Sequence, residues 1–237
     1  MCGRFAMMIR PAEMPVLFAV EEEPEAFPPR FNIAPTQPVL TVLEEHGHRV
    51  SKLMRWGFVP GWVKDPRDFP LLINARIETM PEKPAFRDAL KYGRCIVPAS
   101  GYYEWQMQPD RSKQPCFVTR ADGRPMALAA LCSTWAGPNG EEVDTVATIT
   151  QASAHELADL HDRQPVVLEP DAFDTWLDIR GVGVGEALAL LETPPPGTFR
   201  FHPVSTRVNS AEFDDGDLIA PITPARPPPR PEQLDLF

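Results

Sequence analysis

Residues 94–105 read Arg-Cys-Ile-Val-Pro-Ala-Ser-Gly-Tyr-Tyr-Glu-Trp, and this stretch decides the fold class. The apolar run from Arg94 to Ala99 predicts a strand, and Gly101 to Trp105 follows it directly. Further strands are predicted on both sides, over residues 38–43, 49–56, 115–119, 125–131 and 143–150. The predicted helices are fewer, over residues 11–20, 84–91, 171–177 and 186–191, and the capping-box pattern Ser153-Ala154-His155-Glu156 predicts the start of a further short helix. Because strands outnumber helices and follow one another like hairpins, we predict an α+β fold. It is a single domain over residues 1–220, with a largely antiparallel, barrel-like sheet and flanking short helices.

The composition is that of an ordinary globular protein. The chain has 237 residues, of which 43% are hydrophobic and 24% charged. No apolar run approaches the roughly 20 residues that span a bilayer, and the N-terminus lacks the layout of a signal peptide, so we expect a cytoplasmic protein without a membrane partner. The four cysteines show no C-x-x-C spacing, so no metal or cofactor is expected. We also expect a monomer.

The formal net charge of −10 argues against a protein that coats nucleic acid through overall basicity. Eleven of the 33 acidic residues lie in three blocks, at 21–25, 141–144 and 212–217. Many arginines lie outside these blocks. A local basic groove on an acidic protein therefore stays compatible with the sequence.

The first five residues, Met1-Cys2-Gly3-Arg4-Phe5, suggest a nucleophile. Removal of Met1 would leave an α-amine and a thiol on Cys2, with reference pKa values of about 7.7–8.0 and about 8.5. The amine can form an imine with an aldehyde, and the thiol can then close a five-membered thiazolidine. The alternative is a disordered terminus without a chemical role.

Three polar residues later in the chain are candidates for a site. Asn74 ends an apolar run, as in a strand that delivers polar groups to a cleft, or in a strand whose end is solvated. Glu104 lies between two aromatic residues; it either faces water or has a pKa raised by burial, which suits proton transfer. His161 lies in a polar loop before an apolar run, as a catalytic histidine or an ordinary loop residue.

Residues 55–62, Arg-Trp-Gly-Phe-Val-Pro-Gly-Trp, are dense in aromatic residues, glycine and proline. Such a segment usually packs around a turn. It can also form a stacking surface for unpaired bases. Both interpretations stay open at the level of the sequence.

Together these motifs resemble the SRAP family, the abasic-site processing proteins also called SOS response-associated peptidases. The resemblance covers residues 1 to about 210, and six or more motifs occur in the family's order. They are Met1-Cys2-Gly3-Arg4-Phe5, Asn32-Ile33-Ala34-Pro35, residues 55–62, Ile73-Asn74-Ala75-Arg76-Ile77-Glu78, Gly101-Tyr102-Tyr103-Glu104-Trp105, His161-Asp162-Arg163 and His202-Pro203-Val204-Ser205.

The resemblance implies a β-rich domain that binds single-stranded DNA at abasic sites during replication or the SOS response and becomes crosslinked to it. Cys2 matches the crosslinking residue, and Asn74, Glu104 and His161 match the other active-site positions. The positions expected near the lesion or its flanking strand are Arg4, Asn32, Pro35, Trp62, Arg76 and Arg163. Some members carry a second aromatic residue after the position of Trp62, where this chain has Val63.

The chemistry implied is imine formation by the Cys2 amine followed by closure of a thiazolidine. His161 would assist opening of the sugar ring, Glu104 would carry protons at the amine and imine, and Asn74 would orient the terminus. A hydrolytic alternative uses the same residues in an N-terminal-nucleophile cysteine peptidase or amidohydrolase that removes Met1. A third alternative is a DNA-binding module without catalysis.

The last part of the chain, residues 221–237, is rich in proline and predicts an extended tail without a core. It ends in Gln233-Leu234-Asp235-Leu236-Phe237, which resembles the bacterial sliding-clamp-binding peptide. The resemblance implies the DNA sliding clamp as a partner and a location at the replicating nucleoid. The alternative is an ordinary frayed end.

Overall fold

The computed structural model describes residues 2–223. Its strands are β1 Phe5–Met7, β2 Arg30–Ile33, β3 Pro38–Glu45, β4 His48–Trp56, β5 Asn74–Arg76, β6 Arg94–Ala99, β7 Gly101–Met107, β8 Lys113–Arg120, β9 Met126–Ala136, β10 Glu142–Ala152, β11 Arg163–Pro165, β12 Val167–Leu168 and β13 Phe199–Pro203. Its α-helices are α1 Met14–Phe18, α2 Pro84–Tyr92, α3 Phe173–Leu177 and α4 Val184–Ala189. Short 3₁₀ turns lie at residues 11–13, 66–68, 155–157, 170–172, 206–209 and 216–219.

A closed ring of strands forms the centre of the fold. β4 pairs with β3, β3 with β6, β6 with β9 and β9 with β10, all antiparallel, and β10 returns to β4 in parallel. β5 and β11 extend this sheet along β10, and β12 extends it along β9. The ring leaves its strands without free edges, and apolar side chains such as Val42, Ile96 and Val146 are fully buried. The predicted α+β fold with a largely antiparallel, barrel-like sheet is confirmed.

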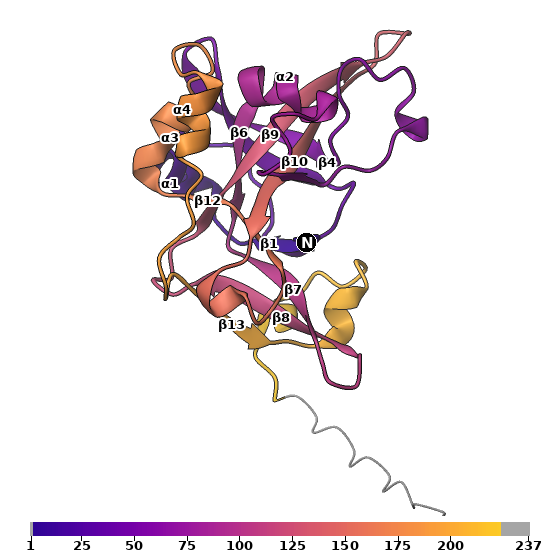
Figure 1. Cartoon of the computed structure of the whole chain (residues 1–237), viewed down its shortest axis with the longest axis vertical. Coiled ribbons are helices and arrows are strands. Elements are labelled where there is room, and N and C mark those ends of the chain that lie inside the picture. The colour runs from indigo at the N-terminus through magenta and orange to yellow at the C-terminus, as the bar shows by residue number, and fades with distance from the viewer. Residues whose placement is uncertain (1, 224–237) are drawn as a thin grey trace, which may run out of the picture.

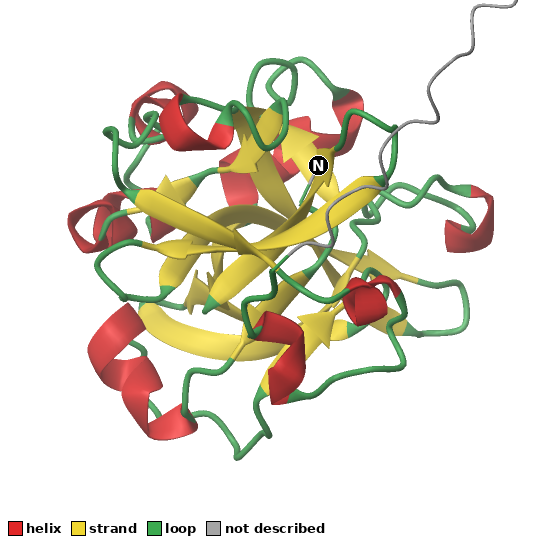
Figure 2. Cartoon of the chain, turned by 90° about the horizontal axis from the view of Figure 1, so that it is seen from below, coloured by secondary structure: helices red, strands yellow, loops and turns green. Residues whose placement is uncertain are grey.

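A second sheet, ordered β13-β8-β7-β1-β2, lies below the barrel in Figure 1. The chain passes from one sheet to the other between β6 and β7, at Ser100 and Gly101. Gly101 is required there, since a Cβ would lie 2.6 Å from the Val118 carbonyl oxygen. The N-terminal end of the chain lies where the two sheets meet (Figure 1), and the helices lie at the periphery of the strands (Figure 2).

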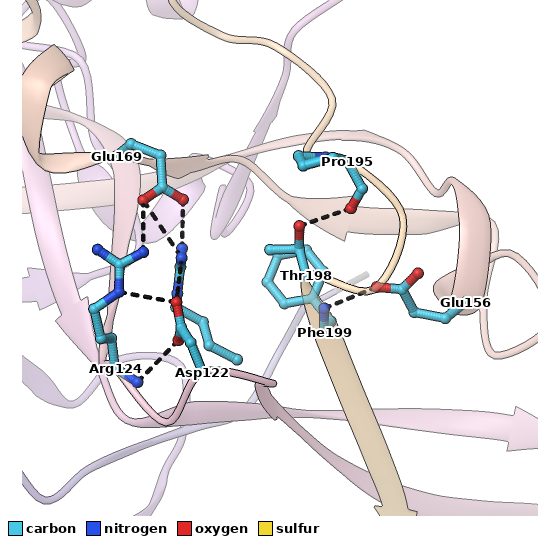
Figure 3. A network of polar contacts seen from close by, with 8 residues as sticks. Asp122, Arg124, Glu156, Glu169, Pro195, Thr198 and Phe199 are labelled. Carbon is cyan, nitrogen blue, oxygen red and sulfur yellow. Dashed lines mark hydrogen bonds and ion pairs between the residues drawn. The ribbon is translucent and has the colours of Figure 1, made fainter.

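Charged side chains join the β8–β9 turn to the segment before α3. Arg120 donates to both Asp122 and Glu169, and Arg124 donates to the same two carboxylates (Figure 3). Hydrogen bonding from Arg120 holds the pKa of Asp122 well below its usual range. Glu156 pins the start of β13 by accepting the Phe199 N–H at 2.8 Å (Figure 3).

Arg94 is a buried cation that ties α3 and the following loop to the barrel. Only 2% of Arg94 is exposed, and its guanidinium donates to four backbone carbonyls, those of Leu90, Trp176, Asp178 and Val182, at 2.6–3.1 Å. Of these carbonyls, that of Asp178 also accepts the Val182 N–H at 3.2 Å. Arg94 therefore acts as a clasp made of hydrogen bonds rather than of an ion pair.

We expect Arg94→Met to lower the free energy of unfolding by about 3–5 kcal/mol, since several buried carbonyls lose their donor. Urea denaturation followed by circular dichroism measures the change. Arg87→Met, at an exposed position of α2, is the matched control and should change stability little. Equal stability of the two variants would contradict the role of Arg94.

Candidate active site

Cys2 is carried into the interior by β1. β1 is antiparallel to β7, with Phe5 opposite Tyr102 and Ala6 opposite Gly101. Continuing this register brings Gly3 opposite Glu104, so Cys2 reaches the same end of the sheet as that carboxylate. Cys2 has no exposed surface, and its thiol lies 4.0 Å from the Arg4 carbonyl oxygen. The N-terminal stretch is thus packed into the fold rather than left as a loose end.

Asn74 reaches the same place from the other sheet. Its Nδ2 donates to the Cys2 carbonyl oxygen at 2.9 Å, while its Oδ1 accepts from the Thr148 hydroxyl at 2.7 Å. Thr148 is brought there by the parallel pairing of β5 with β10, in which it is the direct partner of Asn74. The hydroxyl fixes which end of the Asn74 amide faces Cys2.

Glu104 and His161 complete the group. Glu104 projects from β7 with 3% of its surface exposed, and its Oε1 lies 3.7 Å from His161 Nε2. The Arg163 backbone N–H lies 3.0 Å from His161 Nδ1, and the Asp162 carboxylate lies 2.8 Å from the same nitrogen. These two contacts hold the ring so that Nε2 faces Glu104.

The interior of the site disfavours charge. Burial, together with the nearby Glu104 carboxylate, raises the pKa of the Cys2 thiol to about 12. Burial also raises the pKa of Glu104, although the nearby His161 acts in the opposite direction. The thiol therefore keeps its proton until it reacts, and a carboxylate with a raised pKa beside it can accept that proton.

Two of the residues expected near DNA are engaged within the protein. Arg4 donates to the Asn32 side chain at 2.8 Å and to the Val208 carbonyl at 2.7 Å. Asn32 is fully buried, and its amide donates to the carbonyls of Ser210 and Phe213. These bonds hold the segment after β13 against β2.

The other expected cationic contacts differ in exposure. Arg163 is held by the Glu78 carboxylate and by the Thr150 carbonyl, at 2.9 and 2.7 Å from its Nη2, so its guanidinium is already oriented. Arg76 is exposed at the end of β5, directly after Asn74 and Ala75. Of these two arginines, Arg76 presents the more accessible charge beside the site.

Trp62 and Val63 point in opposite directions from the loop between β4 and β5. Trp62 is 59% exposed and packs edge-to-face on Phe69, with ring centroids 5.8 Å apart. Val63 is buried beside Val59 and Trp135. Pro35 is half-buried in the turn that follows β2. A single exposed aromatic residue is therefore available on this loop tip, and the position after it serves the core.

The structure brings together Cys2, Asn74, Glu104 and His161, all of which could be named from the sequence. It adds Thr148, which sequence reasoning missed. The signal was weak, because a threonine in a strand such as Thr145-Val146-Ala147-Thr148 is an ordinary β-former. Within residues 2–223, no three His, Cys, Asp or Glu side chains are grouped to hold a metal ion, and no helix has the length and apolar character of a membrane span.

Known proteins resemble this chain along almost its whole length. Residues 1–211 match the family described as SOS response associated peptidase (SRAP). Abasic site processing protein YedK of Escherichia coli is 36% identical over 230 residues, which cover 94% of this chain and 100% of YedK. Abasic site processing protein YoqW of Bacillus subtilis is 32% identical over 221 residues, which cover 92% of this chain and 99% of YoqW.

A crystal structure of a protein from Bacteroides thetaiotaomicron has the same fold. Its TM-score is 0.83, and the match covers 94% of this chain and 100% of that protein at 20% sequence identity. The fold is therefore kept at low sequence identity. From the family match over residues 1–211 and the relatives of nearly equal length, the chain belongs to the SRAP family.

Proposed function

We propose that this protein captures abasic sites in single-stranded DNA through a covalent thiazolidine at Cys2 and so shields the lesion. One observation carries the proposal: a buried Cys2 is held by Asn74 and lies beside a buried Glu104 that faces His161. The relatives YedK and YoqW are named as abasic site processing proteins, which supports the same substrate.

The proposed reaction begins after removal of Met1, because the Cys2 nitrogen is otherwise an amide. The amine nitrogen bonds to the aldehyde carbon of the ring-opened abasic sugar. Loss of water gives an imine. The thiol sulfur then bonds to the same carbon, and the thiol proton passes to the nitrogen. Amine, thiol and aldehyde thus combine into a thiazolidine and one water.

The surrounding groups suit the proton transfers in this sequence. We assign His161 to ring opening, since its Nε2 faces the site and an N–H there can donate to the sugar oxygen. Glu104 accepts and returns protons at the amine, the imine and the thiol, a role that a raised pKa favours. Asn74 orients the terminus through the Cys2 carbonyl.

The strand on either side of the lesion is held by contacts that do not read sequence. We propose Arg76 and Arg163 as phosphate contacts, and Trp62 and Pro35 as contacts to the sugar or base. For Arg4 and Asn32, the hydrogen bonds described above favour a role in holding the protein segments around the site. We propose that the exposed part of Arg4 also faces the DNA strand.

Intact mass spectrometry tests the proposal. The mature protein should lack Met1 and should gain the mass of one abasic oligonucleotide less one water. Cys2→Ala should gain no stable mass. A denaturation-resistant adduct of undiminished yield on Cys2→Ala would refute the mechanism.

A second candidate activity is an N-terminal-nucleophile peptidase or amidohydrolase, favoured by the family's description as a peptidase and by the same Cys2–Glu104 pair. This activity predicts turnover of a peptide added in trans by a protein inert toward abasic DNA. This second activity would include the removal of Met1 by the chain itself. If the chain removes its own Met1, blocking Cys2 during expression should leave Met1 in place.

The tail motif Gln233–Phe237 lies outside the described residues, and its proposed role rests on the sequence. We propose that it binds the bacterial sliding clamp, with Leu236 and Phe237 in an apolar pocket of the clamp. Deletion of residues 233–237 should reduce clamp binding to background in surface plasmon resonance and leave crosslinking to short oligonucleotides unchanged. Unchanged clamp affinity would refute this partner. Clamp binding would place the protein near replicating DNA in the cytoplasm.

Thr148→Val should slow adduct formation by about fivefold, because an Asn74 amide that is free to rotate loses roughly 1 kcal/mol of hydrogen bonding that orients it. Gel analysis of adduct against time measures the rate. Thr41→Val is the matched control, since among the described residues the buried Thr41 hydroxyl bonds to no partner. If both variants crosslink at the wild-type rate, Thr148 does not position the site.

A further inference from the structure

A cavity of about 290 Å³ lies under the loop that joins β4 to β5. Its walls come from three places: the end of β4, the loop itself, and the β9–β10 hairpin. The residues that matter for its chemistry are Arg55, Phe58, Phe69, Leu71, Trp135 and Val143. The volume lies just under the ~300–1,000 Å³ of drug-sized sites, so the cavity suits one planar ring system rather than a larger group.

The walls of this cavity offer apolar surface and two cations, Arg55 and Arg67, and Arg67 is already paired with the Asp65 carboxylate. The Thr145 hydroxyl donates to the Ser133 carbonyl at 3.0 Å, and the Trp135 indole N–H donates to the Val63 carbonyl at 2.7 Å. Neither donor is therefore left for a ligand. Arg55 donates from Nη1 to the Gly57 carbonyl at 3.0 Å. Among the residues that the structure describes, no carboxylate pairs with Arg55. Most of its five N–H donors thus remain for a ligand.

Backbone bonds couple this cavity to the active site. The Phe58 N–H donates to the Leu72 carbonyl and closes the root of the loop, and the Trp56 indole donates to the Ile73 carbonyl. Leu71, which is 51% exposed and forms the rim, is three residues before Asn74. An extended chain rises about 3.3 Å per residue, so the rim lies roughly 10 Å along the chain from the residue that holds Cys2.

Gly57 keeps the cavity in its shape. Its φ is +144°, and an added Cβ would lie 2.5 Å from the Leu71 side chain and 2.8 Å from Arg55 Nη1. The missing side chain therefore lets Leu71 and Arg55 converge over the backbone. The arrangement places an apolar wall and a guanidinium at the same opening.

We propose that this cavity receives an unpaired base of the captured DNA strand, a few nucleotides from the lesion. The inference rests on the proposed function. A base has flat apolar faces for Phe69, Leu71 and Val143, and edge acceptors for Arg55, whereas a phosphate would find mainly apolar walls. A spacing of roughly 10 Å corresponds to about three nucleotides in a stacked strand at 3.4 Å each, and to fewer in an extended one.

The cavity would hold the DNA strand by one of its bases, and any of the four bases could fill this role. Each base has a π-face, so the contact adds affinity without a strong sequence preference. It also requires that base to be unpaired, because a base within a duplex cannot leave its partner without cost. The cavity thereby favours lesions in single-stranded DNA over lesions in a duplex.

The test combines base removal in the DNA with truncation of the cavity wall. A set of abasic oligonucleotides carries one additional tetrahydrofuran spacer, which lacks both base and aldehyde, at each position within six nucleotides of the lesion. Crosslinking rates at subsaturating protein are compared for wild type, Leu71→Ala, Arg55→Ala and Leu53→Ala. Leu53 is the matched control, because it is 65% exposed on β4 and does not line the cavity.

For the wild type, a spacer at one position should slow crosslinking by about five- to 150-fold, the range of base–aromatic stacking. The same spacer should have little further effect on Leu71→Ala and Arg55→Ala, and its full effect on Leu53→Ala. Thermal melting of each variant shows that the fold is kept. If Leu71→Ala changes the conformation of the loop, the crosslinking rates of Arg55→Ala still test the cavity.

Two outcomes would overturn the inference. Either no spacer position slows the wild type, or each spacer slows the cavity variants by the same factor as the wild type. In each case a wild-type adduct leaves the proposed function standing, whereas absence of any adduct would remove that function.

Discussion

Cys2→Ser is expected to separate the two bonds of the crosslink. Serine keeps the small side chain that permits removal of Met1, so the mature variant still presents an α-amine. It should form an imine with abasic DNA. Its hydroxyl is a much poorer nucleophile than a thiol and does not close a stable ring. The adduct that survives heat and denaturant should therefore fall to background, while an adduct trapped by borohydride reduction should remain in comparable yield.

The environment of Cys2 sharpens this prediction. Burial raises the pKa of the thiol to about 12, so the thiol enters the reaction with its proton and needs a neighbouring acceptor. We expect Glu104 to accept this proton as the sulfur bonds to the imine carbon. Acetylation of the α-amine should remove both the trapped and the stable adduct. Intact mass spectrometry reports the state of the terminus in each sample.

Cys132→Ser is the control, because Cys132 is half-buried on β9 away from the site. It should form both adducts as the wild type does. A heat-stable adduct on Cys2→Ser would show that the thiol is not the closing nucleophile. Loss of the borohydride-trapped adduct on Cys2→Ser would show that the amine does not act alone in the first step.

The sequence predicts the fold class because its strands are short, apolar and punctuated by turn residues. The strand Arg94–Ala99 is found with both ends as predicted, and the turn at His46 and Gly47 has the positive φ values of a tight hairpin. The parallel pairing of β10 with β4 and β5 could not be predicted. It joins segments far apart in the chain and leaves no local signal.

The helix predicted to begin at Ser153 was wrong, and the structure shows the physical reason. Ser153-Ala154-His155-Glu156 matches a capping box and predicts a helix that begins at Ser153. The structure has only a 3₁₀ turn there, with Ala154 as its N-cap. The Glu156 carboxylate accepts instead from the backbone of Gly197 and Phe199, so a contact with β13 replaces the local one.

The residues of the candidate site could be predicted from the sequence, but the contacts between them could not. Asn74, Glu104 and His161 carry groups whose chemistry is visible in the sequence. The bond from Thr148 to Asn74 exists only through the parallel register of β5 and β10. The internal partners of Arg4 and Asn32 belong to a segment 204 and 178 residues away in the chain, and only the folded chain shows that these side chains hold it.

Glu104→Gln should show the largest loss among variants that keep the Cys2 terminus. General acid–base catalysis contributes typically about 10²–10⁴-fold, so we expect adduct formation to slow by that range. Glutamine keeps the size and hydrogen bonding of the side chain but cannot carry a proton. Single-turnover crosslinking with an abasic oligonucleotide measures the rate.

The same substitution should raise stability at neutral and alkaline pH. The folded-state pKa of Glu104 is raised by burial above its ordinary value of 4.5. Its contribution to stability is therefore fully present below about pH 4.5 and is lost as the pH rises through the folded-state pKa. Glutamine suffers no such loss. Urea denaturation should find Glu104→Gln more stable than wild type at pH 8, with the difference shrinking toward pH 4.

Glu141→Gln is the control of opposite sign, since backbone hydrogen bonds lower the pKa of the exposed Glu141. It should not gain stability at pH 8, and it should crosslink at the wild-type rate. Glu104→Gln should also lower the pH at which the Cys2 thiol is alkylated, because the Glu104 charge contributes to the raised pKa of that thiol. Faster alkylation together with slower crosslinking identifies Glu104 as the proton carrier. Unchanged crosslinking in Glu104→Gln would assign that task to another group.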